Sequence, residues 1–389
     1  MNIKPFAVEE WMNAYEDGAR YNIAETCVDS VSLDELFALC SEDRQAFLEH
    51  FCARRLTYGD IVGSEALREG VCGLYQSLTP SEVVPTHGAA GANYHVFCSL
   101  VSPGDGVVSI MPAYQQMYSI PEAIGADVRL MHLRQENGYL PDLAELRSLV
   151  DVNTKLICVN NPNNPTGALY PREVLQEIVD VARKHQLMIF SDEIYDRLVF
   201  DGEEHVSIAS MAPDLFCVTF SGLSKSHMIA GYRIGWMIFS GNMSCAKDFL
   251  LGINMLSNMR LCSNVPAQSI VQTALGGHQS VNNYIVPGGR IYEQREYIYN
   301  ALNSIDGITA VKPKAAFYIF PKIDVKKFNI TNDEQFALDL LHQKKILITR
   351  GGGFNWGEPD HFRIVYLPRI EVLSEAMRDL EEFLSTYRQ

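Results

Sequence analysis

Short segments that are almost wholly apolar alternate with helical patterns through the middle of the chain, and this alternation limits the fold more than any other feature. Residues 107–111, 155–159 and 187–190 are three of these apolar segments. Strands that are apolar on both sides are typical of parallel sheets with helices packed on each face. The sequence therefore predicts an α/β fold with a mainly parallel central sheet.

The pattern changes near residue 287, where a Pro-Gly-Gly sequence precedes a long helical run and two further strand patterns. This change predicts a second, smaller α+β domain, and a chain of 389 residues is long enough for both. We expect three parts: a segment that packs with the small domain (1–44), a large domain (45–286) and a small C-terminal domain (287–389).

The composition is that of a globular chain with a strong negative charge. The formal net charge of −15 argues against a nucleic acid or an anionic membrane as the main partner. The nine cysteines contain no CxxC pair and the ten histidines no HExxH motif, so the sequence predicts neither a disulfide framework nor a metal site. Because it has no signal pattern and no membrane-spanning apolar run, we expect a cytoplasmic protein.

Lys225 lies in a turn of small residues between two apolar strand patterns, and Arg233 follows shortly after it. Strand ends in an α/β protein form the crevice that binds ligands. A lysine there can hold an aldehyde cofactor as a Schiff base, and a nearby arginine can neutralise the phosphate of that cofactor. An isolated pair of this kind is more often two solvated loop charges, so the interpretation depends on the rest of the chain.

Three other loops that follow predicted strands contain suitable groups. The small residues 88–91 open a helix, whose N-terminus favours an anion, although a plain strand–helix turn is the alternative. The Asn- and Pro-rich residues 160–167 predict a rigid turn with amide donors. Tyr114 could stack on an aromatic ring or be an ordinary core tyrosine.

Asp192 ends a buried strand, and Tyr195 follows it closely. A buried carboxylate is costly unless it is paired. A protonated pyridine nitrogen would be a suitable partner, because the pairing keeps the ring able to accept electrons. The alternative for Asp192 is a helix N-cap. Tyr195 could donate a hydrogen bond to the phenolic oxygen of the same ring.

Together these residues resemble the class I aminotransferase family, which has the type I fold of transferases dependent on pyridoxal 5′-phosphate. The resemblance covers nearly the whole chain, and the motifs occur in the family's order. It implies that pyridoxal 5′-phosphate is the cofactor and that an amino acid and a 2-oxo acid are the substrates. It also implies that Lys225 is the Schiff-base residue and proton carrier, with Asp192 and Tyr195 as its catalytic partners.

The resemblance also implies the remaining contacts. Arg363 is similar to the arginine that binds the substrate α-carboxylate, beside Asn164. Tyr58 resembles the tyrosine that reaches the phosphate in the neighbouring subunit, which implies a homodimer with shared active sites. The expected cofactor-binding set is completed by Ala89, Ala90, Tyr114, Asn164, Asp192, Tyr195, Ser224, Lys225 and Arg233.

The two halves of the chain resemble different branches of the family. The C-terminal half is most similar to alanine (glutamate–pyruvate) aminotransferases, through residues 259–268 and 353–356. In the N-terminal half, residues 22–30 replace the family's Gly-Pro loop, and Gln115-Gln116 follow Tyr114. Both features are similar to capreomycidine synthases, which use the same cofactor to eliminate and cyclise. Glu25 would then meet a cationic substrate side chain, unless it is a solvated loop carboxylate.

Three hypotheses follow for the function. The first is an aminotransferase that moves an amino group between an L-amino acid of the alanine or glutamate type and a 2-oxo acid. The second is a lyase or cyclase, dependent on pyridoxal phosphate, that acts on a basic or hydroxylated amino acid. The third is a non-catalytic member of the fold that acts by binding.

Overall fold

A seven-stranded sheet forms the centre of the computed structural model, which describes residues 3–27, 30–40, 43–75, 78–276 and 281–389. The strand order is β2-β8-β7-β6-β5-β3-β4. Strands β3 to β7 pair in parallel, and β8 joins β7 and β2 antiparallel. The prediction of an α/β fold with a mainly parallel sheet is therefore confirmed. The bounds are β2 Val83–His87, β3 Gly106–Met111, β4 Asp127–His132, β5 Thr154–Asn160, β6 Met188–Asp192, β7 Phe216–Gly222 and β8 Ile234–Gly241.

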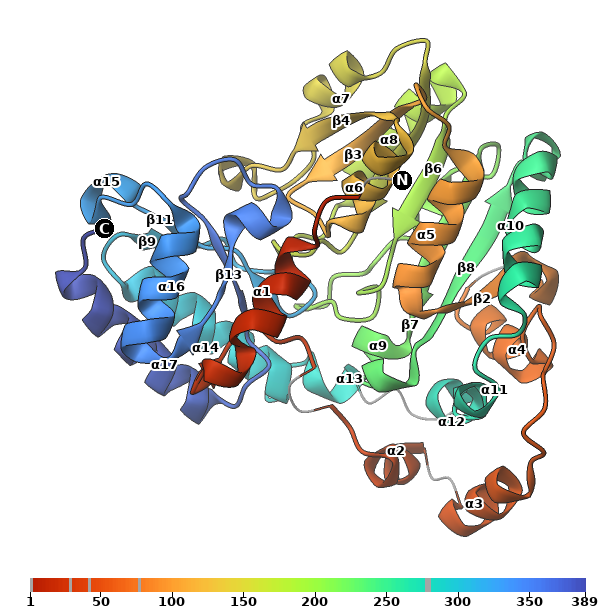
Figure 1. The fold of residues 1–389 in the computed structure, drawn as a ribbon, viewed down its shortest axis with the longest axis horizontal. Coiled ribbons are helices and arrows are strands. Elements are labelled where there is room, and N and C mark those ends of the chain that lie inside the picture. The colour runs from red at the N-terminus through yellow and green to blue at the C-terminus, as the bar shows by residue number, and fades with distance from the viewer. Residues whose placement is uncertain (1–2, 28–29, 41–42, 76–77, 277–280) are drawn as a thin grey trace.

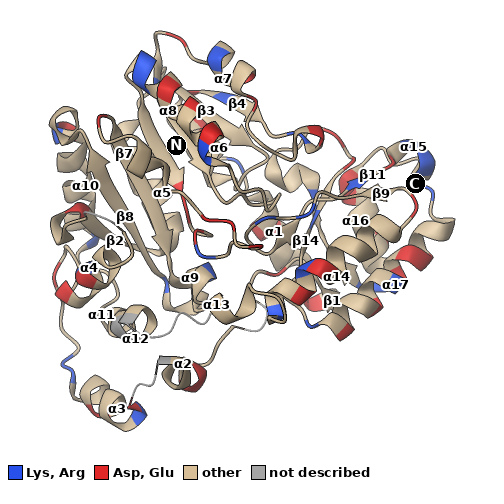
Figure 2. Cartoon of the chain, turned by 180° about the vertical axis from the view of Figure 1, so that it is seen from behind, with Lys and Arg blue, Asp and Glu red and all other residues tan. Residues whose placement is uncertain are grey.

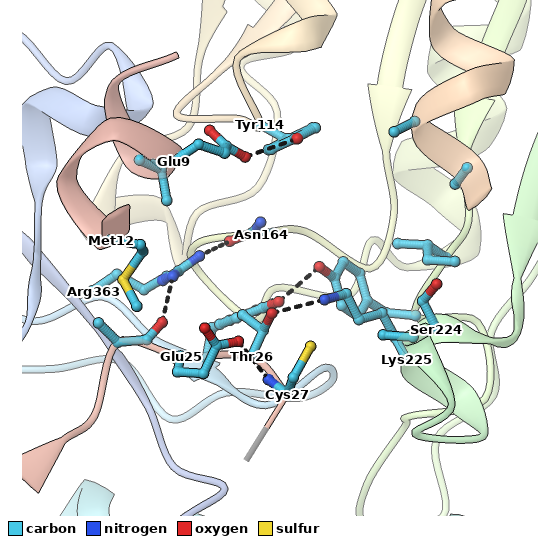
Figure 3. Close-up of a pocket in the computed structure, with 18 of the residues that line it drawn as sticks. Glu9, Met12, Glu25, Thr26, Cys27, Tyr114, Asn164, Ser224, Lys225 and Arg363 are labelled. Atoms are coloured by element: carbon cyan, nitrogen blue, oxygen red, sulfur yellow. Dashed lines mark hydrogen bonds between the residues drawn. The ribbon is translucent and has the colours of Figure 1, made fainter. Parts of the chain in front are cut away.

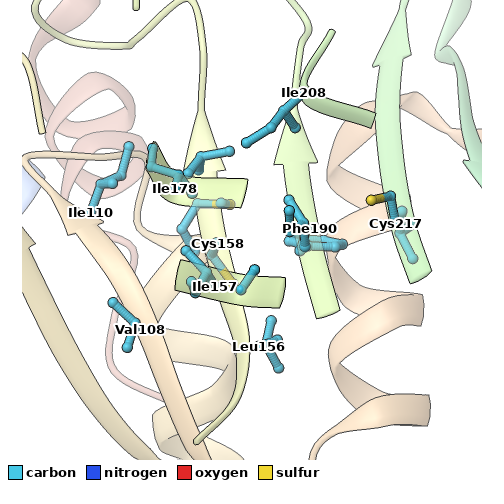
Figure 4. Close-up of a cluster of buried hydrophobic side chains, with 14 of the residues drawn as sticks. Val108, Ile110, Leu156, Ile157, Cys158, Ile178, Phe190, Ile208 and Cys217 are labelled. Carbon is cyan, nitrogen blue, oxygen red and sulfur yellow. The ribbon is translucent and has the colours of Figure 1, made fainter. Parts of the chain in front are cut away.

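The central strands are apolar because both of their sides are covered. Every residue of β3 and of β7 is buried. Figure 4 shows Ile157, Cys158 and Phe190 from neighbouring strands in one apolar cluster with Ile178 of helix α8. The helices of this part of the chain are α4 Glu65–Cys72, α5 Gly88–Leu100, α6 Gln116–Ile124, α7 Leu143–Leu149, α8 Arg172–His185, α9 Leu223–Ser226, α10 Lys247–Arg260, α11 Val265–Gln268 and α12 Val271–Gly276.

A second apolar core lies beside the first, in the part of the chain drawn mainly in blue in Figure 1. This part of the chain contains short strands, and Arg363 lies on one of them, β14. The helices are α13 Val281–Tyr284, α14 Arg290–Ser304, α15 Val325–Phe328, α16 Asp333–Lys344 and α17 Ile370–Thr386. The strands are β9 Ile308–Thr309, β10 Tyr318–Ile319, β11 Lys322–Ile323, β12 Ile346–Leu347, β13 Thr349–Arg350 and β14 Phe362–Val365.

The N-terminal residues pack in two places, one in the second core and one in a third apolar cluster. Strand β1 (Tyr21–Asn22) pairs in parallel with β12, and Trp11 of helix α1 (Ala7–Tyr15) donates its indole N–H to the carbonyl of Ile348 at 2.9 Å. Helix α2 (Leu33–Cys40) instead packs Phe37 into a cluster with Trp236 of the large sheet, and helix α3 (Arg44–Ala53) follows it. The domain boundary at residue 44 stays a prediction.

Gln115 fixes the chain that leads into α1. Its side-chain oxygen accepts a hydrogen bond from the backbone N–H of Ala7 at 2.9 Å, and its amide nitrogen donates to the carbonyl of Pro5 at 2.8 Å. The side chain is buried between the sheet crossover and the N-terminal segment. This glutamine, which the sequence suggested as a mark of lyase-like chemistry, is therefore an anchor for α1.

Charged residues of both signs are mixed over the outer helices, as Figure 2 shows for α8, α14 and α17. None of the helices within the described ranges is long and apolar enough to cross a membrane.

Replacing Gln115 by alanine should destabilise the protein by about 1 to 3 kcal/mol, because the part-buried N–H of Ala7 and the carbonyl of Pro5 lose the partner that the buried glutamine provides. The free energy of unfolding in urea measures this. Gln176→Ala is the matched control, since the hydrogen bond of Gln176 to Asp180 is exposed, and we expect a change within about 0.5 kcal/mol. Equal effects of the two substitutions would contradict the anchoring role of Gln115.

Candidate active site

A cavity of about 480 Å³ lies where the carboxyl ends of the central strands face α1 and β14. This is the position at which open α/β sheets bind ligands, and the volume suits a small molecule. Figure 3 shows Lys225 on one side of the cavity and Arg363 on the other, with Thr26 between them.

The cavity brings together nearly all of the residues predicted for the site. The exception is Tyr58, which is 77% exposed in the segment between α3 and α4 and does not line the cavity of its own chain. The predicted residues that line the cavity are Glu25, Ala89, Ala90, Tyr114, Asn164, Asp192, Tyr195, Ser224, Lys225, Arg233 and Arg363.

Lys225 enters the cavity from α9, directly after the buried strand β7. Its Nζ donates a hydrogen bond to the hydroxyl of Thr26 at 2.9 Å. Burial lowers the pKa of Lys225, and the positive charges of Arg363 and Arg233 lower it further, against the opposing effect of Cys27 and Glu25. Lowering the pKa increases the fraction of neutral amine, which is the form that can accept a proton.

Asp192 is buried at the end of β6, next to Asn160 of β5 in the sheet register. One carboxylate oxygen accepts a hydrogen bond from the backbone N–H of Ile194 at 3.1 Å, so the residue caps a turn. Burial raises the pKa of Asp192 to about 7, although the hydrogen bond from Ile194 and the charge of Lys225 both act to lower it. A cationic partner would therefore stabilise the ionised form of this carboxyl group.

Arg363 is buried on β14 and makes no ion pair with a described residue. Its guanidinium donates to the Asn164 side-chain oxygen at 3.2 Å and to the Ala24 carbonyl at 2.9 Å, and its Nε has no hydrogen-bond partner. The rings of Tyr318 and Phe354 lie 4.8 and 4.9 Å from its charged centre. A buried, incompletely satisfied guanidinium favours a carboxylate ligand, which can accept two parallel hydrogen bonds.

The Asn- and Pro-rich turn is held by its own amides. The side-chain oxygen of Asn160 accepts a hydrogen bond from the backbone N–H of Asn164 at 2.9 Å, and that of Asn163 accepts from the hydroxyl of Thr166 at 2.6 Å. These bonds fix the backbone from which the Asn164 side chain reaches Arg363.

Two tyrosines have polar partners on opposite sides of the cavity. Tyr195 shares a hydrogen bond with Tyr318 of β10 at 2.8 Å between their hydroxyl oxygens. Tyr114 donates to Glu9 of α1 at 2.9 Å. Burial is the main reason why the pKa of each tyrosine is raised, so both stay protonated and able to donate.

Residues 32–380 match the family model described as "Aminotransferase class I and II". The chain belongs to this family. It is 46% identical to a glutamate–pyruvate aminotransferase of Haemophilus influenzae over 85% of this chain and 83% of that protein. An Escherichia coli aminotransferase structure superimposes with a TM-score of 0.91, at 37% identity, covering 99% of this chain and 96% of that one. A PLP-dependent aminotransferase from Streptococcus suis gives 0.89, at 32% identity, with both chains covered completely.

The protein is therefore an aminotransferase and an enzyme. The comparisons do not support the alternative of a capreomycidine synthase-like lyase or cyclase. Residues 28 and 29 of the segment that suggested this alternative lie outside the described residues.

The residues of this aminotransferase form a cradle suited to a phosphate group. Ala89 and Ala90, in the first turn of α5, line the cavity together with Ser224 and Arg233. A side chain at Gly235 would overlap the backbone at Gly88, so glycine is needed for the close approach of β8 to this turn. A helix N-terminus, a hydroxyl group and a guanidinium make a donor set that fits a phosphate.

Sequence reasoning missed the residues that other elements bring to the cavity. Glu9 and Met12 of α1, Thr26 and Cys27 after β1, and Tyr318 of β10 all line it. The sequence around Tyr318 and that of α1 give no local sign of the cavity that these residues line. Their contacts join residues far apart in sequence, and local sequence patterns do not predict such contacts.

Replacing Asp192 by asparagine should stabilise the cofactor-free protein more at pH 8 than at pH 5. The folded pKa is about 7, whereas an unfolded aspartate titrates near 3.9. Wild type thus loses stability as pH rises between these values, and the variant does not. We expect the advantage of the variant to grow by about 2 to 3 kcal/mol from pH 5 to pH 8.

Unfolding in urea at both pH values measures this difference. Asp17→Asn, at an exposed position, should show no comparable growth. An advantage of Asp192→Asn that is the same at both pH values would contradict the effect of burial on Asp192.

Proposed function

We propose that this aminotransferase binds pyridoxal 5′-phosphate and moves an amino group between an L-amino acid of the alanine or glutamate type and a 2-oxo acid. The observation that carries the proposal is the placement of Lys225, Asp192 and Arg363 around one cavity. The 46% identity to a protein named glutamate–pyruvate aminotransferase supports the choice of substrates.

The cofactor site consists of the phosphate cradle at one end and Asp192 at the other. Ala89, Ala90, Ser224 and Arg233 would hold the phosphate, and the Asp192 carboxylate would pair with the ring nitrogen. When bound, pyridoxal phosphate supplies an electron-accepting ring that stabilises the electron pair left after a proton leaves the substrate α-carbon. Tyr114 would contact the ring, and Asn164 and Tyr195 would donate to the ring oxygen.

Arg363 binds and orients the substrate. Its incompletely satisfied guanidinium receives the α-carboxylate, and the rings of Tyr318 and Phe354 keep the arginine side chain in place. Asn164 contacts both the arginine and the substrate end of the cavity. Binding the carboxylate at a fixed point places the α-carbon on the side of the cavity where Lys225 enters.

Lys225 moves the proton. Because burial and the two nearby arginines lower its pKa, its amine can be neutral and accept the α-proton, then return that proton to the acceptor carbon. This role requires the lysine side chain to be free while the substrate amine is bound, and its Nζ lies within the cavity. General base catalysis of this kind contributes about 10² to 10⁴ in rate.

Tyr58 supports the proposal of a homodimer. It is 77% exposed next to Leu56, which is 91% exposed, and such exposed apolar groups are suited to a protein interface. We propose that Tyr58 completes the phosphate site of a second copy. The free cysteines among the described residues agree with a reducing compartment such as the cytoplasm.

A panel of amino donors tests the substrate assignment. With 2-oxoglutarate as acceptor, L-alanine should give glutamate and pyruvate with the highest kcat/KM of the panel. Absorbance of the cofactor in the half-reaction reports each donor without a second substrate. Conversion of no donor in the panel would refute the proposed activity, and a preference for a basic donor would refute the alanine or glutamate assignment.

Replacing Lys225 by alanine should lower turnover by at least about 10²-fold, since the proton carrier is lost. Cofactor should still bind without a covalent bond, which spectra and dialysis measure. Lys314→Ala is the control, because this lysine is exposed and pairs only with Glu203 among the described residues. Full activity of the Lys225 variant would refute the assignment.

A further inference from the structure

The side-chain amine of Lys225 makes one hydrogen bond to the described residues, and Thr26 accepts it. The distance from Nζ to the threonine Oγ1 is 2.9 Å. Figure 3 shows this contact crossing the cavity from α9 to the segment after β1. Lys225 follows β7 of the large sheet, whereas Thr26 follows β1, which pairs with β12, so the bond joins the two halves of the site.

Hydrogen bonds from two directions hold the backbone of the residues just before Thr26. The side-chain oxygen of Asn22 accepts hydrogen bonds from the N–H groups of Ala24 and Glu25, at 3.1 and 3.0 Å. The carbonyl of Ile23 accepts from Val365 of β14 at 2.8 Å. The position of the Thr26 hydroxyl is therefore set by the same strand that carries Arg363.

We propose that Thr26 is a positioning residue for Lys225, whose hydroxyl orients the lysine amine for transfer of the substrate α-proton. This inference rests on the proposed function, in which Lys225 moves that proton. One short segment, residues 24–26, then positions both Lys225 and Arg363. The Ala24 carbonyl accepts a hydrogen bond from Arg363 at 2.9 Å.

A hydroxyl group is suited to this task because it accepts a hydrogen bond without carrying a charge. An amine turns freely about its Cε–Nζ bond, and a fixed acceptor for one N–H restricts the direction of the lone pair. A carboxylate at the same place would stabilise the ammonium form strongly and make a weaker base. The neighbouring carboxylate, Glu25, is engaged instead with the backbone N–H of Cys27 at 2.7 Å.

Thr26→Val keeps the shape of the side chain and removes the acceptor, and Thr26→Ser keeps the hydroxyl. In the valine variant we expect kcat of the amino-acid half-reaction to fall about tenfold, the size expected for one orienting hydrogen bond. KM should change less than about twofold, because Arg363 still binds the carboxylate. The isotope effect with an α-deuterated amino acid should rise, and serine should restore both values.

A second readout does not depend on turnover. In the cofactor-free protein, the rate at which an amine-reactive reagent labels Lys225, followed by peptide mass spectrometry against pH, reports the pKa of that lysine. The hydroxyl oxygen accepts more strongly from the charged amine than from the neutral one. Thr26→Val should therefore shift the midpoint of the labelling rate against pH to a lower pH, and Thr26→Ser should not.

Ser30→Ala is the matched control for the shape of the segment. Ser30 donates to the carbonyl of Cys27 at 2.9 Å and is not among the residues that line the cavity. Its removal should leave the isotope effect and the midpoint of the labelling profile unchanged. Thr26→Ala repeats the test with a smaller side chain if the valine variant does not fold.

Two results would overturn the proposal: an unchanged midpoint and isotope effect in the valine variant, or the same changes in Ser30→Ala. Failure of the proposed function is distinguishable from both, because it would be seen as retained turnover in Lys225→Ala.

Discussion

Charged groups that a folded chain normally keeps in water or pairs with each other are buried around one cavity, and the rest of the structure accommodates that cost. Asp192 and Arg363 are each buried without an ion pair to another described residue. Two apolar cores and the carboxyl ends of parallel strands hold these groups in place. Burying a charge costs several kcal/mol unless a partner arrives, so the site has a strong preference for ligands that carry the opposite charges.

The same constraint explains why the pKa values of the site depart from their ordinary positions. Burial is the main cause for Asp192 and for Lys225, and it acts in opposite directions on an acid and a base. Each group is moved toward neutrality. A neutral lysine can accept a proton. An aspartate whose pKa is about 7 becomes ionised when a cationic group binds beside it. Burial thus prepares both groups for chemistry through one physical effect.

The sequence predicted the part of the site that depends on local order along the chain. Lys225 and Asn164 follow buried strands and Asp192 ends one, and parallel strands bring their carboxyl ends to one edge. Thr26 and Glu9 could not be predicted in the same way, because their places depend on the pairing of β1 with β12 and on the packing of α1. Gln115 shows a further limit: a resemblance suggested chemistry, whereas the side chain anchors backbone.

Helix α1 is attached to both cores at once. Trp11 is bonded to the strand region of the small part, while Glu9 and the residues before the helix are bonded to the crossover that contains Tyr114 and Gln115. Glu9 and Met12 of α1 line the cavity, so the position of this helix determines how much room a ligand has beside Tyr114 and Arg363. The ion pair between Lys4 and Glu122 before the helix is exposed, and since exposed ion pairs contribute little, the contacts of Trp11 and Gln115 are the ones that hold α1 over the cavity.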